Sequence, residues 1–348
     1  MTLLVIITLV LLAIAGHQLL RVVELSRTIK GVPEWKATEA DNRAMAYGMM
    51  TFLLVFFAFC YWQFDKYLDK LLPNSASYHG DDIDWLMNFN LIICTIVFVI
   101  TNVALFYFAF KYYGRKNTKA YFFPHDNRLE MAWTVVPAIV LAFIIFFGLY
   151  YWNQIMDDKD NPNALKIELY AKQFDWTARY PGADKQYGKT DFTMCSGSNM
   201  VGLDTNDAAA KNDVMTKEIH LVVDTEVIFT FRSRDVIHSA YMPHFRAQMN
   251  CVPGQITMFR FRPKYTTVQM RKDPYVMEQV RQVNETRRKL NKDPYEFDYV
   301  LLCNKICGAS HYSMQLKIIV ETQKEFNEWM AKQKPFMADA STPAPKNP

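Results

Sequence analysis

The sequence lacks the signature motifs of several common functional classes. It contains no Cys-x-x-Cys-His segment, so a c-type haem attached covalently to this chain is not expected. It also has no glycine-rich phosphate loop. Helix-turn-helix, RNA-binding and zinc-finger signatures are missing, and the formal net charge is only +4. The sequence therefore gives no support for binding to nucleic acid.

Charged residues are absent from four apolar runs near the start of the chain, namely Met1–Leu20, Ala44–Phe64, Trp85–Phe110 and Met131–Met156. Each run reaches the roughly 20 residues that a helix needs to cross a bilayer. The first basic residue, Arg21, follows the first run, so we expect a retained helix and not a cleaved signal peptide. The sequence predicts four transmembrane helices, two within residues 1–64 and two within 85–156.

Basic residues are unevenly distributed among the loops between these runs. Loops 21–43 and 111–130 carry five Lys or Arg residues each, whereas loop 65–84 carries two. Because basic loops stay on the cytoplasmic side of a membrane, we expect loops 21–43 and 111–130 there. The N-terminus and everything after residue 156 are then outside.

Beyond the last apolar run, residues 165–325 read as a separate domain of short β-strands. The expected strands are Leu165–Tyr170, Glu218–Val223, Val227–Arg232, Gln255–Arg262, Tyr299–Leu302 and Gln315–Glu321. Alternation of apolar and polar residues in several of them is typical of strands with one buried face. So many strands in this length predict an all-β sandwich or Greek-key barrel.

Residues 264–298 interrupt the β pattern with a strongly charged insertion. Asp273-Pro274 predicts the start of a helix over Val276–Leu290, because proline is favoured at the first helical position. The tetrapeptide Lys-Asp-Pro-Tyr recurs at 292–295, which we interpret as a second helix-start signal. The insertion is either a solvated surface helix or a docking element for a partner protein. The tail 335–348 is expected to be mobile.

The six cysteines fall into three groups. Cys60 and Cys94 lie within apolar runs, where small buried hydrophobic residues are the ordinary interpretation. Cys195 and Cys251 fall in the β domain, where an oxidising compartment would allow them to form a disulfide, although no spacing rule requires it. The last two belong to a cluster of metal-ligand residues.

Residues 303–314 place Cys303, Cys307, His311 and Met314 close together in the sequence, and His238 lies upstream. Thiolate, imidazole and thioether groups are ligands that copper prefers. A single blue-copper ion takes only one Cys, so two cysteines predict a dinuclear electron-transfer centre.

Three other interpretations of this cluster are open. The spacing fits one face of a packed helix, although the flanking residues read as strands. Cys303 and Cys307 could form a disulfide, or two Cys and two His could hold zinc. Neither the disulfide nor the zinc site explains the full set. His244, close behind His238, is interpreted as a surface or partner-contact residue.

Several motifs together resemble subunit II of haem-copper cytochrome c oxidases. They are Cys-x-x-x-Cys-Gly-x-x-His-x-x-Met at 303–314, Asp-Val-Ile-His-Ser at 235–239, Val252-Pro253-Gly254, Leu129–Pro137 and Lys172–Trp176. The resemblance covers roughly residues 88–325. It implies a cupredoxin-like domain behind a helical hairpin at 85–156, with the helices of residues 1–64 as additions.

The resemblance also implies a ligand set and partners. Cys303 and Cys307 would bridge the two coppers of copper A, and His238 and His311 would bind one copper each. Met314 and the backbone carbonyl of Lys305 would be weaker ligands. A cytochrome c would donate electrons, and haem in subunit I would receive them for oxygen reduction and proton pumping. Copper B and the haems belong to the partner, subunit III is a further neighbour, and the chain would lie in a bacterial inner membrane with a periplasmic domain.

Glu130 begins a predicted helix, where a carboxylate suits the helix dipole. In the family the matching residue lies at the mouth of a proton-uptake path, and His125 matches a second polar residue there. Rival interpretations are a membrane-tethered copper-delivery protein and a quinol oxidase subunit, which usually lacks the copper ligands.

Three positions differ from the family, and all concern the surface near the copper. Lys305 stands where a Glu usually contributes to a magnesium site, so that site is doubtful. Phe174 replaces a Trp that receives electrons, while Trp176 keeps the second aromatic residue of the entry region. Asn250 replaces an Asp. Because these changes remove negative charge, we expect an unusual donor, such as a haem domain held in a quinol-oxidising complex.

Overall fold

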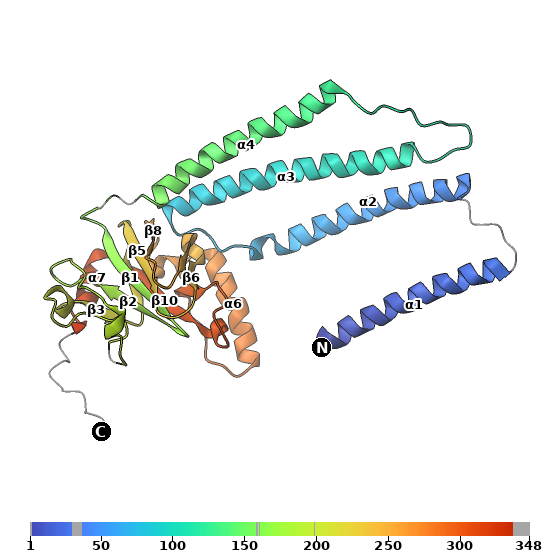
Figure 1. Cartoon of the computed structure of the whole chain (residues 1–348). Helices are drawn as coiled ribbons and strands as arrows, with labels where there is room; N and C mark the ends of the chain where they lie inside the picture. Colours follow the sequence, from blue (N-terminus) through green and yellow to red (C-terminus); the bar gives the residue numbers. More distant parts are fainter. Residues whose placement is uncertain (1, 30–36, 158, 160, 198, 337–348) are drawn as a thin grey trace. The chain divides into compact units, whose positions relative to one another are not determined.

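The computed structural model describes residues 2–29, 37–157, 159, 161–197 and 199–336 (Figure 1). These residues form two compact units. One comprises Met1–Asp65 and Thr95–Pro124, and the other comprises Lys66–Cys94 and His125–Pro348. The tail predicted to be mobile lies outside the described residues from 337 onward.

Four long helices occupy the first part of the chain: α1 (Thr2–Ile29), α2 (Glu39–Tyr67), α3 (Tyr78–Lys111) and α4 (Asn127–Ile155). Among the described residues, α2, α3 and α4 are long and apolar enough to cross a membrane. These three confirm the corresponding predictions. A membrane span at α1 stays a prediction.

Hydrogen bonds link the ends of the helices to neighbouring segments. Asn42 Nδ2 donates to the Gly114 carbonyl at 3.2 Å, so the start of α2 lies beside the segment after α3. The less basic loop contacts the β domain, because the Ala76 N–H donates to the His244 carbonyl at 2.7 Å.

The second unit contains a β-sandwich of two five-stranded sheets, which confirms the predicted fold class (Figure 1). The first sheet has the order β3-β2-β1-β5-β8, and the second has the order β4-β10-β9-β6-β7. The strands of the first are β1 (Leu165–Lys172), β2 (Asp175–Tyr180), β3 (Val214–Thr216), β5 (Val227–Ser233) and β8 (Thr257–Phe261). Those of the second are β4 (Ile219–Val222), β6 (His238–Met242), β7 (Ala247–Cys251), β9 (Tyr299–Cys303) and β10 (Gln315–Glu321).

Alternating side chains build the core between the sheets. On β10, Leu316, Ile318 and Val320 are buried, while Gln315 and Lys317 point outward. A period of two residues places one set of side chains on each face of a strand. Burial of these aliphatic side chains stabilises the sandwich by about 1.5–3 kcal/mol each.

The charged insertion contains two helices, α5 (Thr267–Met270) and α6 (Pro274–Lys289). The Asp273 side chain accepts hydrogen bonds from the Tyr275 and Val276 N–H groups, so the predicted helix start is confirmed. The second Lys-Asp-Pro-Tyr copy does not start a helix, and that prediction was wrong. Instead Asn284 on α6 exchanges hydrogen bonds with the Tyr295 backbone, which holds this segment extended until β9 begins. A short helix α7 (Gln323–Met330) follows β10.

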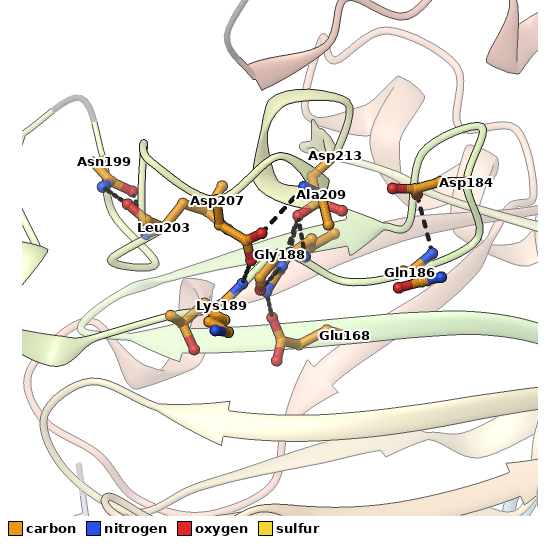
Figure 2. A network of polar contacts seen from close by, with 12 residues as sticks. Glu168, Asp184, Gln186, Gly188, Lys189, Asn199, Leu203, Asp207, Ala209 and Asp213 are labelled. Atoms are coloured by element: carbon orange, nitrogen blue, oxygen red, sulfur yellow. Dashed lines mark hydrogen bonds and ion pairs between the residues drawn. The ribbon is translucent and has the colours of Figure 1, made fainter.

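A buried ion network fixes the long connection between β2 and β3. Arg179, only 1% exposed, pairs with Glu168 at 2.7 Å and with Asp213 at 2.6 Å. Asp213 also accepts from the Gly188 N–H at 3.0 Å (Figure 2). Two carboxylates and an arginine thus connect β1, β2 and the connection across the edge of the sandwich.

Candidate metal centre

Residues 304–314 form the loop between β9 and β10, as predicted. The loop is closed at its base because the Cys303 N–H donates to the Met314 carbonyl at 3.1 Å. It is attached to β6 through the Asn304 N–H, which donates to Ser239 at 2.9 Å. Gly308 has φ +143°, and an added Cβ would lie 2.7 Å from the Phe174 ring. A side chain at this position would strain the backbone and would require the Phe174 ring or the loop to shift.

The structure brings all six predicted donor groups together. The Cys303 and Cys307 Sγ atoms are 3.9 Å apart. His238 Nδ1 lies 3.8 Å from Cys303 Sγ, and His311 Nδ1 lies 3.6 Å from Cys307 Sγ. Met314 Sδ is 3.9 Å from Cys307 Sγ, and the Lys305 carbonyl oxygen is 3.3 Å from Cys303 Sγ. Each thiol therefore has its own neighbouring imidazole and its own neighbouring weak donor.

Four of the six ligand residues are shielded from solvent. His238 is 0% exposed, Met314 2%, Cys307 6% and Cys303 9%. Burial, together with the neighbouring Cys303, raises the pKa of the Cys307 thiol to about 11. A cation that displaced the proton would offset the cost of holding a thiolate in this apolar position.

The structure bears on the three other interpretations of the cluster. A packed helical stripe is excluded, because residues 304–310 are not helical. Both cysteines are free thiols, so they do not form a disulfide. Donor atoms around a single tetrahedral zinc lie about 3.6 Å from one another. Here the close group within 4.8 Å comprises His238, Cys303 and Cys307, and His311 adjoins it from the Cys307 side. His311 therefore stands outside the closest group of ligand atoms.

Asp235 orients His238, and sequence reasoning did not single it out. Its carboxylate lies 2.9 Å from His238 Nε2 and also accepts from the Gln173 N–H at 2.7 Å. Burial alone would raise the pKa of Asp235, but these hydrogen bonds outweigh it and leave the pKa below its ordinary value. An ionised carboxylate at Nε2 keeps the proton there, so Nδ1 is free to bind a metal.

The aromatic residues predicted for electron entry occupy different depths. Trp176 is 0% exposed, and its ring lies 6.0 Å from the His238 ring. Phe174 is half-buried against Gly308 of the loop. Only Phe174 of the two therefore reaches the surface. Gln173 supports the same loop, since its Nε2 donates to the Cys307 carbonyl at 2.5 Å.

Other predicted residues lie away from the donors or at the surface. Lys305 and Asn250 are exposed, so their side chains are free to vary without touching the donor set. His244 was expected at the surface but lies between Phe297 and Tyr299, and burial lowers its pKa to about 4. The surface interpretation of His244 was wrong, because the insertion covers it.

His125 and Glu130 lie together at the start of α4, far along the chain from the donors. His125 Nδ1 is 3.6 Å from Glu130 Oε1, and both side chains are solvent-accessible. Asp126 is the N-cap of α4 and accepts from the Arg128 and Leu129 N–H groups. The capping role thus belongs to Asp126, which leaves the Glu130 carboxylate available.

The remaining cysteine pair is not bridged. Cys195 and Cys251 are both free thiols. Cys251 is fully buried in the core on β7, and burial raises its pKa to about 12. It behaves as a small apolar core residue.

The membrane helices, the sandwich and the buried cluster define a membrane-anchored β-sandwich protein with a candidate metal site. The sequence model of the family described as "Cytochrome C oxidase subunit II, transmembrane domain" matches residues 62–150. The alternative cytochrome c oxidase subunit 2 of Bradyrhizobium diazoefficiens is 31% identical over 69% of this chain and 76% of that relative. Cytochrome c oxidase subunit 2 of Cereibacter sphaeroides is 22% identical over 79% of this chain and 83% of its own length.

Among solved structures, the periplasmic domain of cytochrome oxidase subunit II from Bradyrhizobium japonicum is 18% identical, with a TM-score of 0.30. The match covers 49% of this chain and 94% of the solved domain. The extent and identity of the Bradyrhizobium diazoefficiens match show the family. The chain belongs to the cytochrome c oxidase subunit 2 family and is a membrane-bound subunit of that oxidoreductase.

Proposed function

We propose that this chain accepts electrons from a cytochrome c at a dinuclear copper centre and passes them to haem in subunit I. The carrying observation is the pairing of donors, with one imidazole beside each of two unbridged thiols. His238, Cys303, Cys307, His311 and Met314, with the Lys305 carbonyl, would hold the two coppers. The copper pair would supply one-electron acceptance and release.

The protein contributes a preformed and shielded cage. Three of the donors lie on or beside strands, and Asp235 fixes His238 through a hydrogen bond of 2.9 Å. Metal ligands held in place limit the rearrangement of the site when an electron arrives or leaves. Burial also argues against the alternative of copper delivery, because a delivery protein must expose its ligands to a recipient, whereas His238, Cys303, Cys307 and Met314 are buried.

The surroundings support further parts of the proposal. We place the sandwich on the periplasmic side of a bacterial inner membrane, because it contacts the less basic loop and basic loops stay on the cytoplasmic side. Glu130 and His125 lie at the start of α4, at the other end of that helix from the sandwich, and would serve proton uptake toward the catalytic subunit, where oxygen is reduced and protons are pumped. The exposed Lys305 cation gives no support for a magnesium ion beside the cage.

Electron paramagnetic resonance of the purified full-length protein tests the proposal. Two coppers sharing one unpaired electron give a seven-line hyperfine pattern. We expect that pattern in the wild type and its loss in Cys307→Ser, while the matched variant Cys195→Ser keeps it. A four-line spectrum from a single copper, or zinc as the bound metal, would contradict the proposal.

A further inference from the structure

A cavity lies where the membrane helices join the sandwich, away from the metal centre. It has a volume of about 500 Å³, within the range of roughly 300–1,000 Å³ typical of small-ligand sites. Its walls are the first turn of α3, the last turn of α4 and strand β8, with the charged residues Asp82, Glu226, Arg260 and Arg262 among the lining. These elements belong to the same compact unit.

Two of the four charges are already neutralised. Arg260 lies 3.4 Å from Glu226 and donates to the Lys159 carbonyl at 2.8 Å. Glu226 also accepts from Asn161 Nδ2 at 2.6 Å. The Arg260–Glu226 pair lies in one part of the lining, and Asp82 and Arg262 are the two other charged residues of the cavity.

Asp82 and Arg262 have no ion-pair partner among the residues that the structure describes. Arg262 is exposed, and its guanidinium lies 4.2 Å from the centre of the Tyr78 ring, which holds it in place. Tyr78 is fixed in turn by its hydroxyl, which donates to Asp224 at 2.7 Å. The cavity therefore presents one unpaired anion and one positioned, unpaired cation.

The height of the cavity matches the headgroup layer of a bilayer. Trp85 on α3 and Trp152 on α4 are 46% and 57% exposed, as expected for aromatic residues at a membrane–water interface. With a rise of 1.5 Å per residue, Asp82 and Tyr78 lie about 4.5 and 10 Å beyond Trp85. The polar headgroup region occupies roughly 5–8 Å on each side of the hydrocarbon core.

We propose that this cavity binds the headgroup of a zwitterionic phospholipid with a primary ammonium group, that is, a phosphatidylethanolamine. Arg262 would bind the phosphate, because guanidinium groups donate several hydrogen bonds to phosphate oxygens. Asp82 would accept hydrogen bonds from the ammonium. An anionic lipid without an amine would leave Asp82 facing a phosphate, and a choline headgroup could donate no N–H to it. The acyl chains would extend along the exposed apolar sides of α3 and α4.

Lipid retention in the intact oxidase assembly tests the proposal independently of the copper. The assembly would be purified in mild detergent, given an equimolar mixture of isotope-labelled phosphatidylethanolamine, phosphatidylcholine and phosphatidylglycerol, and analysed by native mass spectrometry. We expect preferential retention of phosphatidylethanolamine. Asp82→Asn should reduce that preference about tenfold, the effect of losing one charge-assisted hydrogen bond. Arg262→Gln should reduce the retention of all three lipids about tenfold, because the phosphate is common to them. Arg281→Gln, which alters an exposed arginine on α6, is the matched control and should change nothing.

Other outcomes would overturn the proposal. Equal retention of the three lipids, or a preference that Asp82→Asn leaves unchanged, would do so. Displacement of the lipid by inorganic phosphate alone would assign the cavity to a simple anion. Loss of another subunit from the variants, with unchanged lipid retention, would show that the cavity is a protein interface. An unchanged copper spectrum in each variant confirms that it has folded.

Discussion

Asp235→Asn should weaken copper binding about tenfold without unfolding the domain. In the structure the Asp235 carboxylate lies 2.9 Å from Nε2 of His238, a residue that is 0% exposed. A hydrogen bond to a charged group contributes about 1.5–3 kcal/mol, and a neutral one about 0.5–1.5 kcal/mol. The difference of about 1–1.5 kcal/mol corresponds to roughly a tenfold change in affinity. Alanine, which leaves the buried Nε2–H without a partner, should cost more, up to about a hundredfold.

The measurement is an equilibrium competition for copper between the full-length protein and a chelator of known affinity. Asp175→Asn is the matched control. It is the same substitution of a carboxylate by an amide, but Asp175 pairs with the exposed Lys217. An exposed pair contributes about 0–1 kcal/mol, and it does not touch the donors. Thermal unfolding of each apo-protein separates lost affinity from lost fold. Equal copper affinity in wild type and Asp235→Asn would refute the assignment of Asp235 as the residue that positions His238.

Three further predictions follow from the geometry. Arg179→Ala should destabilise the sandwich by about 3–5 kcal/mol, because it leaves two buried carboxylates without a partner. Denaturant unfolding followed by tryptophan fluorescence would measure this loss of stability. A loss no larger than that of the surface variant Arg281→Ala would contradict the prediction. Glu130→Ala should slow proton-coupled turnover of the assembled oxidase while the copper spectrum stays intact, and unchanged turnover would remove Glu130 from the proposed path. Phe174→Leu should slow electron entry from a reduced cytochrome c in stopped-flow measurements, because Phe174 reaches the surface beside the loop, whereas full retention of the rate would place the entry point elsewhere.

Strands with regular alternation could be predicted from the sequence, and those with mixed patterns could not. Gln315–Glu321 alternates clearly and forms β10 with those bounds. His238–Met242 and Ala247–Cys251 form β6 and β7 although neither has the β-branched residues that favour strands. Their pairing with each other and with β9 decides their conformation. The helix α7 was missed too, although Thr322 and Glu325 form a capping box that the sequence displays.

The candidate metal-ligand residues could be recognised in the sequence because thiol, imidazole and thioether groups are rare and those at 303–314 are closely spaced. The residues that support them were not visible. Asp235 reaches His238 locally, but its second hydrogen bond comes from Gln173, far away in the sequence. His244 was misjudged for the same reason, since its burial depends on Phe297 at the end of the insertion and on Tyr299 at the start of β9. Contacts of this kind depend on tertiary structure, and no local pattern reports them.

The departures from the family pattern lie where the structure can accept them. Lys305 offers only its backbone carbonyl to the cage, 3.3 Å from Cys303 Sγ, while its side chain is exposed. Ile306 and Tyr312 of the same loop are each 87% exposed, so the loop also presents two large apolar side chains to solvent. Substitution of the Lys305 side chain therefore alters the exposed surface of the loop and leaves the six ligand groups unchanged.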